Sequence, residues 1–192
     1  MNLSRPLLLA SNSPRRKELL ASLGLTFEVR VKEVSEDFPD TLKREEVAEF
    51  LASHKADAYK EDLQEEALIT ADTIVCLDDK ILNKPASAEE AYAMLRALSG
   101  QTHEVITGVC VLMKEGKTVF HDSTTVYFKE LTDAEINYYI QHYKPFDKAG
   151  AYGIQEWIGM IGIEKIEGTY FNVVGLPVQK LYENLVQLKI VV

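Results

Sequence analysis

The sequence has few of the features that would mark a secreted or membrane-bound protein. It contains only two cysteines in 192 residues, Cys76 and Cys110, and both lie in apolar, strand-like segments. That context favours buried, reduced thiols over a disulfide framework. No apolar run approaches the roughly 20 residues that a membrane span needs, and residues 6–10 are too few for the apolar part of a secretory signal. We therefore expect a cytoplasmic protein that does not contact a membrane.

Positive charge is also scarce. The chain has 21 Lys and Arg against 30 Asp and Glu, which gives a formal net charge of −9. Broad nucleic-acid binding requires a basic surface, so we expect no nucleic-acid partner. An acidic protein that handles phosphates must gather its basic residues locally or recruit a metal ion. The length and the hydrophobic fraction of 46% suit one domain, residues 1–192, with a buried core.

The order of apolar patterns predicts an α/β fold with a mixed, twisted sheet flanked by helices. Strands are predicted at 7–10, 26–31, 67–77, 80–82, 103–113 and 117–129. Helices are predicted at 14–23, 44–59, 88–98, 133–143 and 177–188, with Ser87 and Thr132 as caps. The segments 152–154, 159–166 and 170–174 look extended.

The start of the first predicted helix carries an unusual charge pattern. Ser13 is a good N-cap and Pro14 a good first residue, but Arg15, Arg16 and Lys17 follow at once. Cations are unfavourable at the positive end of a helix, by roughly 0.3–1 kcal/mol each. Two interpretations stay level on this stretch alone: basic side chains that extend into water, and an anion site that takes a phosphate.

Other candidate residues have a structural and a functional interpretation. Asp72 interrupts an apolar run and is either a carboxylate that holds the backbone or a general base or metal ligand. Lys55 and Lys84 are either surface charges or phosphate ligands. The acidic loop with Glu33 and Glu36 is either plain surface or a source of ligands for a hard divalent cation.

A glycine-containing segment at 147–155 completes the candidates. Gly150 and Gly153 indicate either a tight turn or close approach of the backbone to a ligand. The segment is not a Walker A loop, and zinc spacings, HExxH and GxSxG are absent from the sequence.

Taken together, these segments resemble the Maf family of nucleoside triphosphate pyrophosphatases. The matching motifs occur in the family's order and span almost the whole chain. They are Ala10-Ser11-Asn12-Ser13-Pro14-Arg15-Arg16, Ala71-Asp72-Thr73-Ile74-Val75, Lys84-Pro85, Leu98-Ser99-Gly100-Gln101-Thr102-His103, residues 147–155 and Val174-Gly175-Leu176-Pro177.

The resemblance implies a fold, a reaction and a set of roles. The fold would be a two-lobed single domain, similar to inosine triphosphatases, with a central cleft. The reaction would be hydrolysis of a nucleoside triphosphate between the α and β phosphates, with Mg²⁺ or Mn²⁺ as cofactor. By position, Asp72 matches the proton acceptor and, with Glu36 or its neighbour Glu33, the metal site. The family's basic groups that hold the triphosphate match Arg15, Lys55 and Lys84. Ser11 would contribute the turn before the helix, and Arg16 would support either the phosphates or the fold.

The resemblance also implies a substrate. The positions that distinguish the subgroup hydrolysing dTTP and UTP match Arg15, Thr73 and Gln155. We therefore expect dTTP and UTP as substrates, together with modified pyrimidine nucleotides. The expected role is the housekeeping removal of non-canonical nucleotides. Glu156-Trp157 departs from the small residues of many relatives and leaves the breadth of substrates open. The alternatives are a nucleotide-responsive regulator of septum formation and a purine pyrophosphatase of inosine type. The family also suggests a homodimer.

Overall fold

The computed structural model describes residues 1–192 and contains one seven-stranded mixed sheet with helices. The strands lie in the order β2, β1, β3, β5, β6, β7, and β4 pairs with β3. Their bounds are β1 Leu7–Leu9, β2 Glu28–Val29, β3 Ala67–Leu77, β4 Lys80–Leu82, β5 Thr102–Met113, β6 Gly116–Phe128 and β7 Ile163–Glu167. Because β1 is parallel to β2 and β3 whereas β4 and β7 are antiparallel to their neighbours, the predicted mixed α/β sheet is confirmed.

Seven α-helices and one 3₁₀ turn lie between the strands or follow the last one. They are α1 Pro14–Ser22, α2 Glu45–Asp57, α3 Ala88–Leu98, α4 Asp133–Tyr143, η1 Ala149–Ala151, α5 Trp157–Gly162, α6 Tyr170–Val174 and α7 Val178–Gln187. None of these helices is long and apolar enough to cross a membrane. The predicted caps are present, since Ser13, Ser87 and Thr132 each accept a backbone hydrogen bond from the third helical residue.

The chain divides into two compact units. The first comprises Met1–Asp72, Thr107–Asp122 and Gly175–Val192, and the second comprises Thr73–Ile106 and Ser123–Val174. That the 192 residues make one domain stays a prediction.

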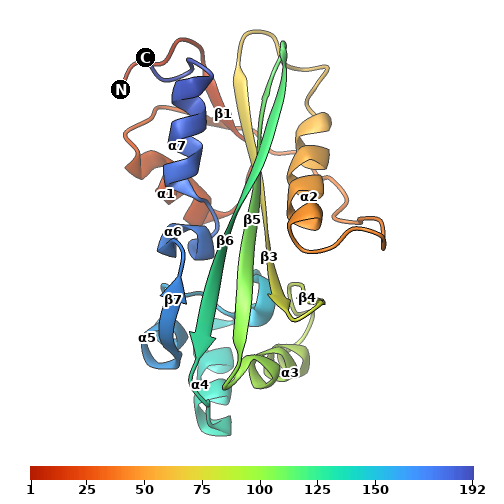
Figure 1. Cartoon of the computed structure of the whole chain (residues 1–192), viewed down its shortest axis with the longest axis vertical. Helices are drawn as coiled ribbons and strands as arrows, with labels where there is room; N and C mark the ends of the chain where they lie inside the picture. The colour runs from red at the N-terminus through yellow and green to blue at the C-terminus, as the bar shows by residue number, and fades with distance from the viewer. The chain divides into compact units, whose positions relative to one another are not determined.

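In the first unit, alternating strand residues supply two hydrophobic layers. Leu8 and Cys110 pack with α2, whereas their strand neighbours Leu7, Leu9 and Val109 pack with α1 and α7. Figure 1 shows α2 on one side of these strands and α1 and α7 on the other. The sheet here is therefore covered on both faces, which explains the nearly continuous apolar sequence of β3.

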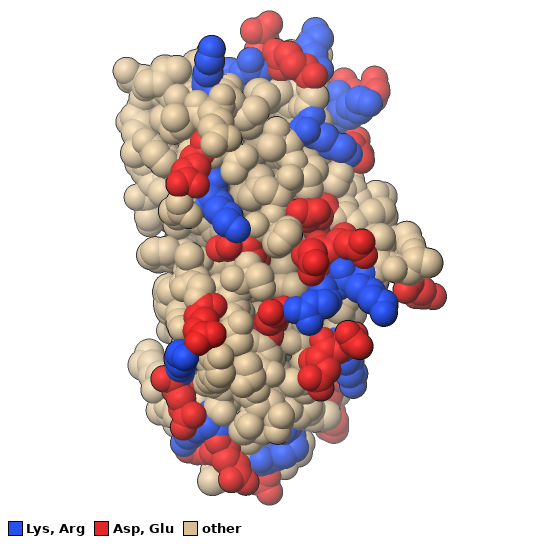
Figure 2. Space-filling view, viewed as in Figure 1, with Lys and Arg blue, Asp and Glu red and all other residues tan.

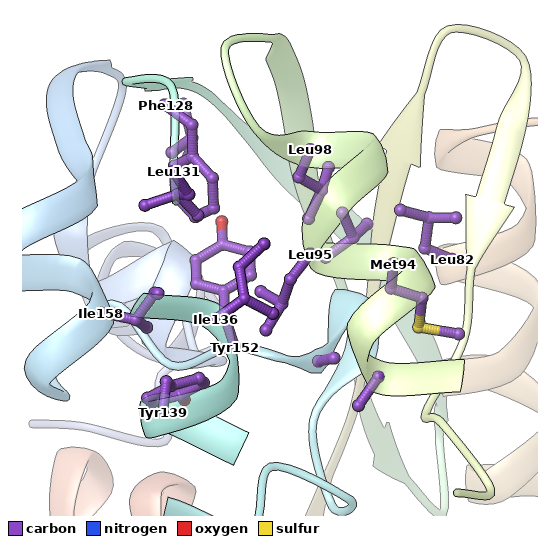
Figure 3. Packing of buried hydrophobic residues seen from close by; sticks show 14 of the residues in the cluster. Leu82, Met94, Leu95, Leu98, Phe128, Leu131, Ile136, Tyr139, Tyr152 and Ile158 are labelled. Carbon is purple, nitrogen blue, oxygen red and sulfur yellow. The ribbon is translucent and has the colours of Figure 1, made fainter. Parts of the chain in front are cut away.

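The second unit has a core of its own between its helices and strands. Leu95 and Leu98 of α3 lie close to Ile136 of α4 and to Tyr152, as Figure 3 shows. His103 is buried in this core, and its Nε2 lies 2.7 Å from the hydroxyl oxygen of Tyr152. Burial lowers the pKa of His103 to about 4, because the charged imidazolium is disfavoured there.

The prediction of an extended segment at 170–174 was wrong, because these residues form α6, and so was its counterpart at 159–162, which belongs to α5; residues 163–166 are extended in β7, as predicted. In α6 the apolar and aromatic residues suggested a strand, but Asn172 fixes a helical turn. Its side-chain amide donates to the carbonyl oxygen of Val105 and to Thr124 Oγ1, each at 3.0 Å. In α5, Gly159 lets the helix pack on the preceding turn, because a Cβ there would lie 1.9 Å from the carbonyl oxygen of Ile154. Tertiary contacts thus override local propensity in α6, whereas in α5 close packing of the backbone at Gly159 does so.

The charged side chains are intermixed on the face shown in Figure 2, where Lys and Arg alternate with Asp and Glu. That face has no continuous basic surface. A phosphate site on this face would therefore have to be built from particular residues rather than from a general positive field.

Candidate active site

The turn before α1 is held by its own serines. Ser11 is buried, and its Oγ accepts the backbone N–H of Ser13 at 3.2 Å. Ser13 in turn caps the helix by accepting the N–H of Arg16 at 3.4 Å. The first turn of α1 contains no acidic residue. Its partial positive charge is therefore not offset by a carboxylate of the helix itself.

Arg16 fastens this turn to two distant segments. Its Nε donates to the carbonyl oxygen of Gly175 and its Nη1 to that of Ala71, both at 2.8 Å. Burial lowers the pKa of Arg16, whereas the carboxylates of Asp72 and Glu36 act in the opposite direction. A buried guanidinium with backbone partners is a positioning group. Arg16 joins the start of α1 to the middle of β3, next to Asp72.

Three charged side chains of the first unit meet in one cluster, which we call the Asp72 cluster: Glu36, Lys55 and Asp72. The Nζ of Lys55 donates to Asp72 Oδ1 and, at 2.8 Å, to Glu36 Oε1. Asp72 is only 8% exposed, so an unpaired charge there would be expensive. Lys55 stands in the last turn of α2, where a cation is also favoured by the helix dipole.

The close contact between α2 and the sheet sets the position of Lys55. Thr70 Oγ1 donates to the carbonyl oxygen of Ala52 at 2.6 Å. On β5, Gly108 leaves room for the helix backbone, since a Cβ at this position would lie 2.2 Å from the carbonyl oxygen of Ala48. Sequence reasoning missed this role of Gly108, because no local pattern in an apolar strand marks a glycine as a helix contact.

The donor set of the Asp72 cluster fits a small divalent cation. Asp72 and Glu36 each direct a carboxylate oxygen at the same ammonium group, so the two oxygens converge on one cation. Mg²⁺ typically takes one or two protein carboxylates and completes its shell with water and substrate phosphates. No group of three or more His, Cys, Asp or Glu side chains able to hold a metal ion occurs in the chain. A metal held by these two carboxylates would complete its shell with water and phosphate oxygens.

The remaining predicted residues belong to the second unit. Lys84 is exposed in the loop after β4, and the neighbouring Asn83 is tied to η1 by a hydrogen bond of 3.2 Å from the N–H of Gly150. Gln155 is half-buried, and its Oε1 is buried without a hydrogen-bond partner. Thr73 is half-buried in β3, directly after Asp72. That these residues act with the Asp72 cluster and Arg15 stays a prediction.

Comparison with known proteins identifies the family. The family model described as Maf-like protein matches residues 6–188. The dTTP/UTP pyrophosphatase of Parabacteroides distasonis is 54% identical over 93% of this chain and 94% of its own length. The protein of that name from Bacteroides fragilis strain YCH46 is 54% identical over 97% of this chain and 98% of its own.

A solved structure of a nucleoside-triphosphatase / dITP/XTP pyrophosphatase from Mycobacterium abscessus aligns with 66% of this chain and 75% of its own, at 16% identity and a TM-score of 0.42. That likeness carries no argument about the site. The family match and the two relatives cover nearly the full length, and on these grounds the chain belongs to the Maf family.

Proposed function

We propose that this protein hydrolyses dTTP and UTP at the linkage between the α and β phosphates, releasing a nucleoside monophosphate and pyrophosphate. The observation that carries the proposal is the Asp72 cluster, in which a buried carboxylate, a lysine and a second carboxylate converge. The names of relatives that are 54% identical over more than nine tenths of this chain support the substrate class.

Asp72 is the proton acceptor in this proposal. A water oxygen forms a bond to phosphorus, its proton passes to the Asp72 carboxylate, and the P–O bond of the α–β linkage breaks. Lys55 pairs with Asp72 and orients its carboxylate before substrate binds, and its ammonium then serves the triphosphate. Arg15 and Lys84 add positive charge where negative charge develops on the leaving pyrophosphate.

Glu36 and Asp72 would hold a Mg²⁺ or Mn²⁺ ion. The ion would supply Lewis-acid stabilisation of the phosphate oxygens when it is bound. The contact of Lys55 with Glu36 favours Glu36 over its neighbour Glu33 as the second carboxylate. The same contact gives Lys55 a further role, because the lysine keeps two nearby carboxylates from repelling each other.

Gln155 is the proposed reader of the base, with Arg15 and Thr73 as the other discriminating residues. Its unpartnered Oε1 suits a ligand that brings an N–H donor. Uracil and thymine present an N–H at N3, whereas cytosine presents an acceptor at the same atom. A site built around this acceptor would reject cytosine because two acceptors would face each other. Removal of non-canonical pyrimidine nucleotides is the housekeeping role we propose.

A panel of nucleoside triphosphates with Mg²⁺ or Mn²⁺ and identification of the products tests the proposal. Wild-type protein should convert dTTP and UTP to monophosphate and pyrophosphate. Asp72→Asn should lower the rate by about 10²–10⁴-fold, whereas Asp79→Asn, a matched change at an exposed position after β3, should leave it unchanged. Orthophosphate as the first product, or full activity of Asp72→Asn, would contradict the proposal. Tight nucleotide binding without turnover would favour the regulatory alternative.

A further inference from the structure

Gln155 lies in a tight turn whose geometry is closed by the backbone. The N–H of Glu156 donates to the carbonyl oxygen of Gly153 at 3.0 Å, so Gln155 is the third residue of a four-residue turn. The backbone of Glu156 also begins α5, because its carbonyl oxygen accepts the N–H of Gly159 at 3.0 Å. The base-reading residue of the proposed function therefore lies inside a turn that leads directly into a helix.

A tyrosine hydroxyl from another element connects the two ends of this turn. Tyr139 of α4 is fully buried, and its Oη accepts the N–H of Gly153 at 3.0 Å. The same hydroxyl donates its proton to Glu156 Oε2. Burial, reinforced by the bond to Glu156, raises the pKa of Tyr139, so the hydroxyl stays a donor at any working pH.

The second carboxylate oxygen of Glu156, Oε1, also has a partner. The Nζ of Lys148 lies 3.1 Å from Glu156 Oε1 and 2.7 Å from Asp147 Oδ1. The side chain of Lys148 is only 9% exposed, and these two carboxylates offset the cost of burying its ammonium group. The carboxylate of Glu156 thus has a fixed partner at each oxygen, which leaves it little freedom to rotate.

The amide of Gln155 is packed against the turn that these groups hold. A Cβ on Gly153 would lie 2.8 Å from Gln155 Nε2 and 3.2 Å from Glu156 Oε2. The side chain of Gln155 therefore rests against the bare Cα of Gly153, beside the Glu156 carboxylate. Movement of either end of the turn has to move the amide.

We propose that Tyr139 and Glu156 are positioning residues for base selection. Their hydrogen bond holds the turn at Gly153–Glu156 and fixes the direction in which the Gln155 amide presents its oxygen. This inference rests on the proposed function. An amide can offer its oxygen or, after half a turn, its NH₂ group, and the two orientations favour opposite hydrogen-bond partners. When the turn is held, the Gln155 amide keeps the orientation that suits uracil and thymine. When the turn is mobile, the amide can also take the orientation that binds cytosine.

Removal of the Tyr139 hydroxyl tests whether its hydrogen bonds hold the turn. In Tyr139→Phe, the amide protons of Gly153 and Glu156 should exchange with solvent about tenfold faster, since the hydroxyl that supports both ends of the turn is gone. The ratio of kcat/KM for UTP over CTP should fall by about tenfold, mainly through KM for UTP. Tyr92→Phe is the matched control, because it removes a tyrosine–carboxylate bond of 2.6 Å to Asp133 elsewhere in the same unit. Its ratio should change by less than about twofold.

Two variants of Glu156 separate positioning from mere folding. Glu156→Gln keeps an acceptor for the Tyr139 hydroxyl, whereas Glu156→Ala removes it. We expect Glu156→Gln to retain most of the UTP preference and Glu156→Ala to lose as much of it as Tyr139→Phe. Equal losses in the two Glu156 variants would overturn the role of the hydroxyl bond. An unchanged UTP-to-CTP ratio in Tyr139→Phe would overturn the inference altogether.

A binding assay distinguishes failure of the inference from failure of the proposed function. Trp157 is the single tryptophan and directly follows Glu156, so its fluorescence can follow titration with UMP and CMP. A wild type that prefers UMP but hydrolyses no triphosphate would overturn the proposed function alone. A fall of that preference in Tyr139→Phe would still support the positioning role of the Tyr139 hydroxyl. A wild type without preference in either assay would overturn both.

Discussion

Gly108 offers a direct test of how the fold positions Lys55. A Cβ at this residue of β5 would lie 2.2 Å from the carbonyl oxygen and 2.3 Å from the carbonyl carbon of Ala48, in the backbone of α2. Ordinary van der Waals contact begins near 3.4 Å. In Gly108→Ala, the helix and the strand must therefore separate by about 1 Å, since backbone atoms cannot rotate away as a side chain can.

We expect Gly108→Ala to lower both the stability of the fold and the rate of hydrolysis. Overpacking of this kind destabilises a core by about 1–3 kcal/mol, and a clash with backbone belongs at the upper end. Because Lys55 lies two turns further along α2, the displacement should also move its ammonium from Asp72 and Glu36. A misplacement of about 1 Å in a catalytic group can lower a rate by about 10²-fold. Urea unfolding and the rate of UTP hydrolysis in native buffer measure the two effects separately.

Gly24→Ala is the control for adding a methyl group. A Cβ at Gly24 would meet no atom within 4 Å, and its φ of +71° adds only local strain, of about 1–2 kcal/mol. We expect Gly24→Ala to lose stability without losing activity. If Gly108→Ala unfolds within about 0.5 kcal/mol of wild type and keeps its rate, then contact with Gly108 does not set the position of α2 and Lys55.

Two further predictions follow from buried titratable groups. Because the pKa of His103 is about 4 in the folded protein and 6.5 without burial, the unfolded chain binds more protons between these values, and stability should be lost as the pH falls through that window. At pH 5 the loss should be about 2 kcal/mol; urea unfolding of His103→Asn should lack this part of the pH dependence, and an unchanged slope would contradict the assignment. Burial raises the pKa of Cys110 to about 12, so iodoacetamide at pH 8 should label it only after unfolding. Peptide mass spectrometry measures this, and rapid labelling of the native protein would refute it.

Local signals made much of the fold predictable from sequence. The cap at Ser13, the reciprocal capping of Thr132 with Glu135 and the apolar run of β3 each act within a few residues. The structure confirms all three. The same signals misled for α6, because the helix depends on bonds from Asn172 to residues 67 and 48 positions away. Propensity contains no information about such distant partners.

The candidate site shows the same division. Sequence reasoning could name Asp72 and Lys55, since a carboxylate in an apolar run and a lysine at a helix end are visible in one dimension. It could not show that Lys55 also contacts Glu36, or that Arg16 bonds to Ala71 and Gly175, 55 and 159 residues away. The two hydrogen bonds of the Tyr139 hydroxyl could not be predicted from the sequence, because its partners lie 14 and 17 residues further along the chain.

The route of the chain through its two compact units limits how this protein can be divided. The backbone passes from one unit to the other four times, and three of these passages fall inside β3, β5 and β6. Neither unit is a contiguous stretch of gene, so neither can be expressed as a simple fragment or exchanged by one recombination event. A cut at any of the three passages would also sever a strand of the sheet. Changes to either unit must therefore be made by point substitutions within an intact chain.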